Sequence, residues 1–136
     1  MNMLEEGDRL QLDFGKLAKA AACGHGLVPV AVQSVDTGEV ILVAYTNDKA
    51  FRLSMETRTA VFWSTSRNEL WIKGKTSGNT FELVETYVNC EQNSLLYKVR
   101  PRVDGICHTK NKGGKPRNCY YRRIKPGTLT LENVDP

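Results

Sequence analysis

Several features are missing from this sequence of 136 residues, and each absence excludes a class of protein. No apolar run approaches the roughly 20 residues that a membrane-spanning helix needs. The start, MNMLEEGDRL, lacks the charged-then-apolar layout of a signal peptide, so we expect a cytoplasmic protein whose thiols stay reduced. There is no low-complexity segment, internal repeat or linker, which predicts a single domain over residues 1–136 with a core of its own.

Cysteine is scarce, and no two of the four cysteines form a CxxC pair. Three of them, Cys90, Cys107 and Cys119, lie within residues 87–121. The last two flank the loop 108–118, HTKNKGGKPRN, which has glycines, a proline and no apolar side chain that could pack the cysteines into a core. Three thiolates suit zinc and leave a fourth position for water. The spacing alone leaves one or two ordinary free thiols as an alternative.

Histidine is rarer still, with two residues in the chain. His108 directly follows Cys107, where it fits a general acid or base, a fourth metal ligand, or an exposed loop residue. His25 and Cys23 have no comparable neighbours, so we interpret both as structural.

Acidic residues are almost absent from residues 98–125, which hold ten lysines and arginines and a single acid, Asp104. Basic patches of this kind bind phosphate, on a nucleotide or on nucleic acid. A solvated, lysine-rich face explains the same charge equally well.

Helix-forming patterns are few, and strand-like patterns dominate. We expect a helix over residues 13–24, a β-hairpin over 28–45, and a second helix over 48–58 with Asn47 as its N-cap. Further strand-like runs cover residues 60–65, 69–74, 80–88 and 94–99, and 128–134 is either a last strand or a loose tail. The pattern predicts an α+β domain, mostly antiparallel β-sheet with two or three short helices.

A second polar patch covers residues 71–79, WIKGKTSGN, where cations, hydroxyls and flexible backbone occur together. Backbone N–H groups with a lysine can form a nest that holds phosphate, although most glycine-bearing turns are only turns. Just upstream, FWSTSR adds Ser64, Ser66 and Arg67. Trp63 or Trp71 suits stacking on a base, and core packing explains each tryptophan as well.

Taken together, GLVPVAVQSVDTGEVILVAYTN, FWSTSRNELWIKGKTSGN and the cysteines with CHT resemble the phosphoribosyl-AMP cyclohydrolases. These enzymes of histidine biosynthesis open an adenine ring. The resemblance runs from about Phe14 to Arg122, which leaves residues 123–136 as a C-terminal tail.

The resemblance implies an intertwined homodimer with active sites at the subunit interface. It implies zinc held by Cys107 and Cys119 with Cys90, two cysteines from one subunit and one from the other. A zinc-bound hydroxide would attack C6 of the 1-phosphoribosylated adenine, the N1–C6 bond would break, and His108 would do the acid/base work. The implied nucleotide- and phosphate-binding residues are Ser64, Ser66, Arg67, Trp71, Lys73, Gly74, Thr76, Ser77, Gly78 and Asn79.

The sequence departs from this family in two places. The family writes its first cysteine as Asp-Cys-Asp-x-Asp, whose carboxylates bind magnesium, whereas this chain has Asn89, Glu91 and Asn93 at those positions. The loss of two formal charges is expected to weaken Mg²⁺ binding severely. The loop 108–118 is also longer than the family's usual link and carries additional basic residues.

Three functions therefore stand as hypotheses. The first is a phosphoribosyl-AMP cyclohydrolase that needs Zn²⁺ and has dispensed with the magnesium site. The second is a paralogue with the same chemistry on another purine-like nucleotide. The third is a non-catalytic, zinc-stabilised module that binds nucleotide or RNA. The retained cysteines, His108 and KGKTSGN favour an enzyme with a nucleotide substrate, with no membrane partner and no nucleic acid.

Overall fold

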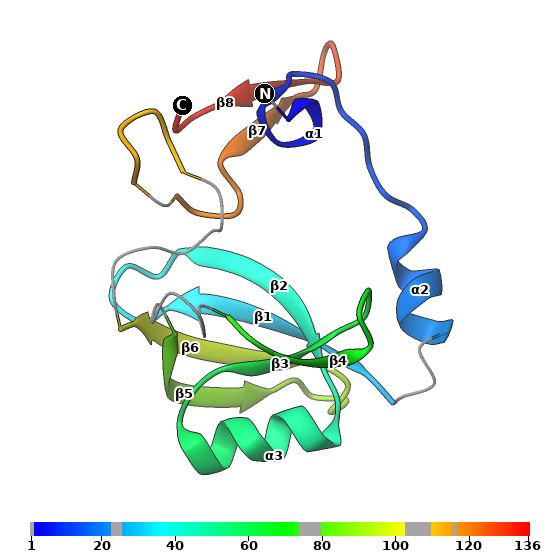
Figure 1. Ribbon diagram of the computed structural model, residues 1–136, viewed down its shortest axis with the longest axis vertical. Coiled ribbons are helices and arrows are strands. Elements are labelled where there is room, and N and C mark those ends of the chain that lie inside the picture. Colours follow the sequence, from blue (N-terminus) through cyan, green and yellow to red (C-terminus); the bar gives the residue numbers. More distant parts are fainter. Residues whose placement is uncertain (1, 23–25, 74–79, 103–109, 116) are drawn as a thin grey trace. The chain divides into compact units, whose positions relative to one another are not determined.

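The computed structural model describes residues 2–22, 26–73, 80–102, 110–115 and 117–136 (Figure 1). The chain divides into two compact units, Gly15–Asp104 and a second one made of Met1–Phe14 with Gly105–Pro136, and each is described by itself. Among the described helices, none provides an apolar stretch long enough to traverse a bilayer.

A four-stranded sheet forms the centre of the larger unit, in the order β2-β1-β6-β5 (Figure 1). Its strands are β1 (Val28–Ser34), β2 (Val40–Thr46), β5 (Phe81–Val88) and β6 (Leu95–Pro101). β1 pairs antiparallel with β2 and parallel with β6, and β6 pairs antiparallel with β5. Alternate residues of β1 are buried, because successive side chains of a strand point to opposite faces and one face forms the core.

A smaller sheet in the same unit pairs β3 (Val61–Ser64) with β4 (Glu69–Ile72). Phe62 of β3 is fully buried and lies 5.6 Å, ring centre to ring centre, from Trp71 and 6.0 Å from Tyr97 of β6. These aromatic contacts join the two sheets in one core. The larger unit also contains helix α2 (Lys16–Ala22).

Helix α3 (Asp48–Thr57) follows β2 and begins where the sequence predicts, since the Asn47 Oδ1 accepts the Ala50 N–H at 2.9 Å. Its buried residue Ser54 ties the helix to β3. The Ser54 Oγ lies 3.0 Å from the carbonyl oxygens of Ala50 and Val61, and it accepts the Val61 N–H at 2.9 Å. A single hydroxyl therefore satisfies backbone groups of two elements in a dry environment.

Replacing Ser54 by alanine should lower the free energy of unfolding by about 1–3 kcal/mol, because the buried Val61 N–H loses its acceptor. Urea denaturation followed by circular dichroism measures this change. Thr57→Ala is the matched control: its exposed hydroxyl donates only to Leu53 O, and its loss should be nearly neutral. Equal stability of Ser54→Ala and the unmodified protein would contradict the role given to this hydroxyl.

The smaller unit combines both ends of the chain. It contains helix α1 (Met3–Glu6) and the hairpin of β7 (Arg122–Lys125) with β8 (Thr130–Asn133). The Tyr121 hydroxyl donates to Glu5 O at 2.6 Å, and the Leu131 N–H donates to Asp8 O at 2.8 Å. Backbone carbonyl groups of the N-terminal segment therefore accept hydrogen bonds from Tyr121 and from β8, which hold this segment against the hairpin.

The predicted α+β class, mostly antiparallel sheet with two or three short helices, is confirmed, and the described residues contain three helices. Residues 128–134 contain a strand rather than only a loose tail. Two elements, α1 and β7, were not predicted. A helix of four residues has too little periodicity to be recognised, and β7 is a basic tetrapeptide with one apolar residue. The parallel β1–β6 pairing joins segments that are more than 60 residues apart in sequence, so local patterns could not reveal it.

Candidate functional site

Cys90 lies in the turn between β5 and β6, and its side chain is exposed. The Asn89 N–H donates to Ser94 O at 3.2 Å, and the Gln92 N–H donates to Asn89 O at 3.0 Å. Gln92 has a φ of 56°, in the left-handed region that side-chain-bearing residues seldom adopt. The turn therefore has a defined conformation that presents the Cys90 thiol at the surface of the larger unit.

The side chains on both sides of Cys90 are bonded to one another. The Asn89 Oδ1 accepts the backbone N–H groups of Asn93 at 2.9 Å and Ser94 at 3.0 Å. The Asn89 Nδ2 donates to the Asn93 Oδ1 at 2.6 Å, and the Asn93 Nδ2 donates to the Glu91 Oε2 at 3.3 Å. The three residues at the predicted magnesium positions thus form one hydrogen-bonded chain.

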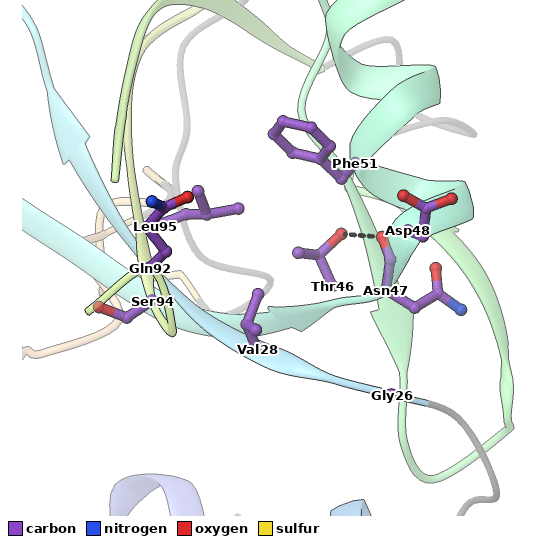
Figure 2. A pocket seen from close by; sticks show the side chains of 9 residues that line it. All are labelled: Gly26, Val28, Thr46, Asn47, Asp48, Phe51, Gln92, Ser94 and Leu95. Carbon is purple, nitrogen blue, oxygen red and sulfur yellow. Dashed lines mark hydrogen bonds between the residues drawn. The ribbon is translucent and has the colours of Figure 1, made fainter. Parts of the chain in front are cut away.

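A pocket of about 220 Å³ opens beside this turn (Figure 2). Gln92, Ser94 and Leu95 form one side, facing Phe51 and the start of α3 across a floor that includes Val28 and Thr46. The remaining lining residues are Gly26, Asn47 and Asp48. Its lining combines apolar side chains with polar ones, as the lining of a small-molecule site does.

The turn between β3 and β4 holds three of the predicted nucleotide-binding residues. The hydroxyls of Ser64 and Ser66 lie 3.3 Å apart, and the Arg67 N–H donates to the Ser64 Oγ at 3.3 Å. The exposed Arg67 guanidinium is 3.5 Å from the Glu69 carboxylate. The structure therefore brings these three residues together on one turn.

Trp71 and Lys73 lie at the end of the same hairpin. Trp71 is half-buried against Phe62, and the Lys73 Nζ sits 5.1 Å from the centre of the Phe81 ring. Trp63 is buried, and its indole N–H donates to the Asn68 Oδ1 at 3.1 Å, so core packing accounts for this tryptophan. The other predicted residues of this patch, Gly74, Thr76, Ser77, Gly78 and Asn79, lie outside the described residues.

Cys119, the second described cysteine of the predicted trio, belongs to the smaller unit and is exposed. It lines a pocket of about 230 Å³ together with residues that include Leu10, Arg122 and Leu131. Partial burial raises the pKa of Tyr120, and the negative charge of the Cys119 thiolate raises it further. Cys107 and His108 lie outside the described residues, and within the described ranges no three His, Cys, Asp or Glu side chains gather as a metal cluster.

Most arginines of the basic segment are occupied by partners within the fold. Arg100 donates to the Asp36 carboxylate through Nε and Nη2, both at 3.0 Å, which lowers the pKa of Asp36. Arg102 donates to Thr59 and Thr80, and the exposed Arg123 pairs with Glu132 at 2.8 Å. Arg117 is buried and pairs with Glu6. Much of the charge is therefore structural, a role that the sequence left open.

The pocket residues were not identified from the sequence. They come from the ends of β1, β2 and β6, from the turn between β5 and β6 and from the start of α3, so no local pattern connects them. The one available signal was Asn47, which was recognised only as a helix cap. The sequence did not indicate Gln92 as a pocket residue. Its left-handed backbone conformation contributes to the shape of the turn, and this conformation cannot be predicted from the residue type.

Comparisons with known proteins agree on one family. The phosphoribosyl-AMP cyclohydrolase family matches residues 42–121. A protein of Hyphomonas neptunium named phosphoribosyl-AMP cyclohydrolase is 42% identical over 107 residues, which cover 79% of this chain and 77% of that protein. Proteins of the same name from Caulobacter vibrioides and Syntrophotalea carbinolica are 46% and 39% identical, over 76% and 93% of this chain and 72% and 91% of their own lengths. This chain belongs to the phosphoribosyl-AMP cyclohydrolase family.

Proposed function

We propose that this protein hydrolyses the N1–C6 bond of phosphoribosyl-AMP in histidine biosynthesis. The family membership supports the reaction. The observation on this chain's own geometry that supports it is the pocket beside the Cys90 turn. Water supplies an oxygen to C6, which becomes a carboxamide carbon, and a proton to N1, which leaves as an amidine nitrogen. The single ring-opened product therefore contains all the atoms of the substrate and of one water.

Cys90, Cys107 and Cys119 are the proposed zinc ligands, with Cys90 from one subunit of a homodimer and the other two from its partner. The donor set fits the metal, because three thiolates suit zinc and the two described cysteines both have exposed side chains. Bound zinc would supply the Lewis acidity that lowers the pKa of a coordinated water to about 7. His108, next to Cys107 in sequence, would deliver the proton to N1.

The pocket lined by Gln92 and Phe51 is the proposed site of the purine base. Its volume of about 220 Å³ suits one ring system rather than a whole nucleotide. Val28, Phe51 and Leu95 offer apolar contact to the ring faces, and Gln92 offers a carboxamide to the ring edge. Because Gln92 lies two residues after Cys90 in the same turn, a base held here would be close to a zinc ligand.

The phosphates are assigned to the β3–β4 hairpin, where Ser64 and Ser66 precede the KGKTSGN motif, which begins at Lys73. The internal pairing of Arg100, Arg117 and Arg123 argues against a nucleic-acid module, because these charges already have carboxylate partners. A small phosphorylated substrate needs only a few of the remaining cations.

A ring-opening assay tests the proposal. Zinc-loaded protein mixed with phosphoribosyl-AMP should change the ultraviolet absorbance of the base as the six-membered ring opens, with turnover in the usual enzyme range of about 1–10³ per second. AMP, which carries no substituent on N1, is the control and should remain intact. An inert phosphoribosyl-AMP together with salt-sensitive RNA binding would overturn the proposal in favour of a binding module.

A further inference from the structure

We infer that Asn89 and Asn93 take over, through hydrogen bonds, the part that a divalent cation would play in holding the Cys90 turn. The inference rests on the proposed function for the importance of Cys90, and on the described turn for its geometry. It makes Asn89 and Asn93 positioning residues for a zinc ligand. It also makes the zinc site of this protein independent of magnesium.

The orientation of each asparagine side-chain amide, that is, which atom is the oxygen and which the nitrogen, follows from the groups at the two ends of the turn. At one end, two backbone N–H groups, of Asn93 and Ser94, point at the side chain of Asn89, so the atom that they meet must be its oxygen. The Asn89 Nδ2 then faces Asn93, whose facing atom must be an acceptor. At the other end, the Asn93 Nδ2 faces the Glu91 carboxylate, which accepts. Each of these four hydrogen bonds therefore joins a donor to an acceptor.

The same oxygens are the ones a hard cation would need. The Asn89 Oδ1 already accepts two N–H groups, the Asn93 Oδ1 accepts one at 2.6 Å, and the Glu91 Oε2 accepts another. Mg²⁺ demands near-octahedral oxygen ligands about 2.0–2.1 Å away and binds through carboxylates. This turn offers one carboxylate, and binding a cation would break the bonds that shape it. Magnesium does not fit these residues.

Aspartate at positions 89 and 93 would behave differently. A carboxylate has no hydrogen to donate, so two carboxylates at the 2.6 Å separation of Asn89 and Asn93 would repel unless a cation lay between them. Asparagine at these positions replaces the repulsion with hydrogen bonds, because the Asn89 Nδ2 donates to the Asn93 Oδ1 and the Asn93 Nδ2 donates to the Glu91 Oε2. The two exchanges therefore preserve the shape of the turn while removing its need for a metal.

The test compares zinc affinity with and without magnesium, by chelator competition, in the unmodified protein, two double variants and one control variant. The unmodified protein should hold zinc equally well in both buffers. Asn89→Ala with Asn93→Ala should lose about 10–100-fold in zinc affinity, the usual effect of removing groups that orient a ligand, and magnesium should not restore it. Asn89→Asp with Asn93→Asp should lose zinc affinity without magnesium and regain it when magnesium is added. The control Asn68→Asp, in the turn between β3 and β4, should hold zinc as tightly as the unmodified protein in both buffers.

Amide hydrogen exchange of zinc-free protein gives a second readout that does not depend on the proposed function. The N–H groups of Asn93 and Ser94 should exchange equally slowly with and without magnesium, and Asn89→Ala should speed both by about tenfold or more. Magnesium-dependent protection in the unmodified protein, or a double aspartate variant that binds zinc normally without magnesium, would overturn the inference. A protein that binds no zinc overturns the proposed function instead, and the exchange data still decide the role of the asparagines.

Discussion

Replacing Cys119 with serine should abolish zinc retention and lower ring-opening activity by more than about 10³-fold. The serine hydroxyl is not ionised at neutral pH and binds zinc far more weakly than a thiolate. If zinc activates the attacking water as proposed, its loss leaves that water with its much higher ordinary pKa, so little nucleophile forms. Zinc content by atomic emission and turnover of phosphoribosyl-AMP measure the two effects.

The matched control is Cys23→Ser, which removes the one cysteine outside the proposed trio. This variant should keep one zinc ion per chain and its full activity. A Cys119→Ser protein that retains stoichiometric zinc would refute the ligand assignment.

A zinc site shared between two subunits can be recognised from the activity of mixed dimers. If Cys90 of one chain completes a site with Cys107 and Cys119 of its partner, Cys90→Ser and Cys119→Ser homodimers are both inactive. Mixed dimers then contain one intact site, so unfolding and refolding the two variants together should restore about a quarter of full activity. No recovery in refolded mixtures would place all three ligands on one chain.

Replacing Arg117 with methionine should destabilise the smaller unit by about 3 kcal/mol, which is the second large effect we expect. The Arg117 side chain is 1% exposed, lies 3.7 Å from the centre of the Tyr121 ring, and donates to the Glu6 carboxylate and to Asp135 O. Methionine refills the volume but leaves the Glu6 charge without its partner. The cost falls at the lower end of the range for buried pairs, since 33% of the Glu6 side chain remains in water.

Hydrogen exchange of the β7 and β8 amides measures this change, and a loss of about 3 kcal/mol corresponds to roughly 100-fold faster exchange. Arg123→Met is the control, because Arg123 also pairs with a glutamate, Glu132, but at the surface. It should change exchange by only a few-fold. Unchanged exchange in Arg117→Met would show that this buried pair does not hold the unit together.

The sequence predicted most of the larger unit because its elements follow from neighbouring residues. Alternating valines specify β1, and Asn47 specifies the start of α3, where its oxygen meets the Ala50 N–H. Most of the smaller unit, with the exception of β8, escaped prediction for the converse reason. Its stability comes from pairs such as Glu6 with Arg117, which are 111 residues apart in sequence and leave no periodic pattern.

The basic segment shows the same limit for the candidate site. Lysines and arginines of residues 98–125 look alike in sequence, yet Arg100 is held by Asp36 and Arg117 is buried against Glu6. Charge is a property of the residue, whereas its availability to a phosphate depends on which carboxylates the fold brings near it. The structure thus shows that part of this uniform basic run is occupied by carboxylate partners within the fold.

Residue identity alone determined the family motifs, the three candidate thiolates and the loss of two carboxylates around Cys90, because each is a matter of which atoms the chain carries. Tertiary structure alone decided that a pocket opens beside that turn and that Asn89, Asn93 and Glu91 bond to one another. The physical reason is that a hydrogen bond depends on the positions of donor and acceptor to within a few tenths of an ångström. Those positions are fixed only when β5 and β6 pair and bring the two ends of the turn together.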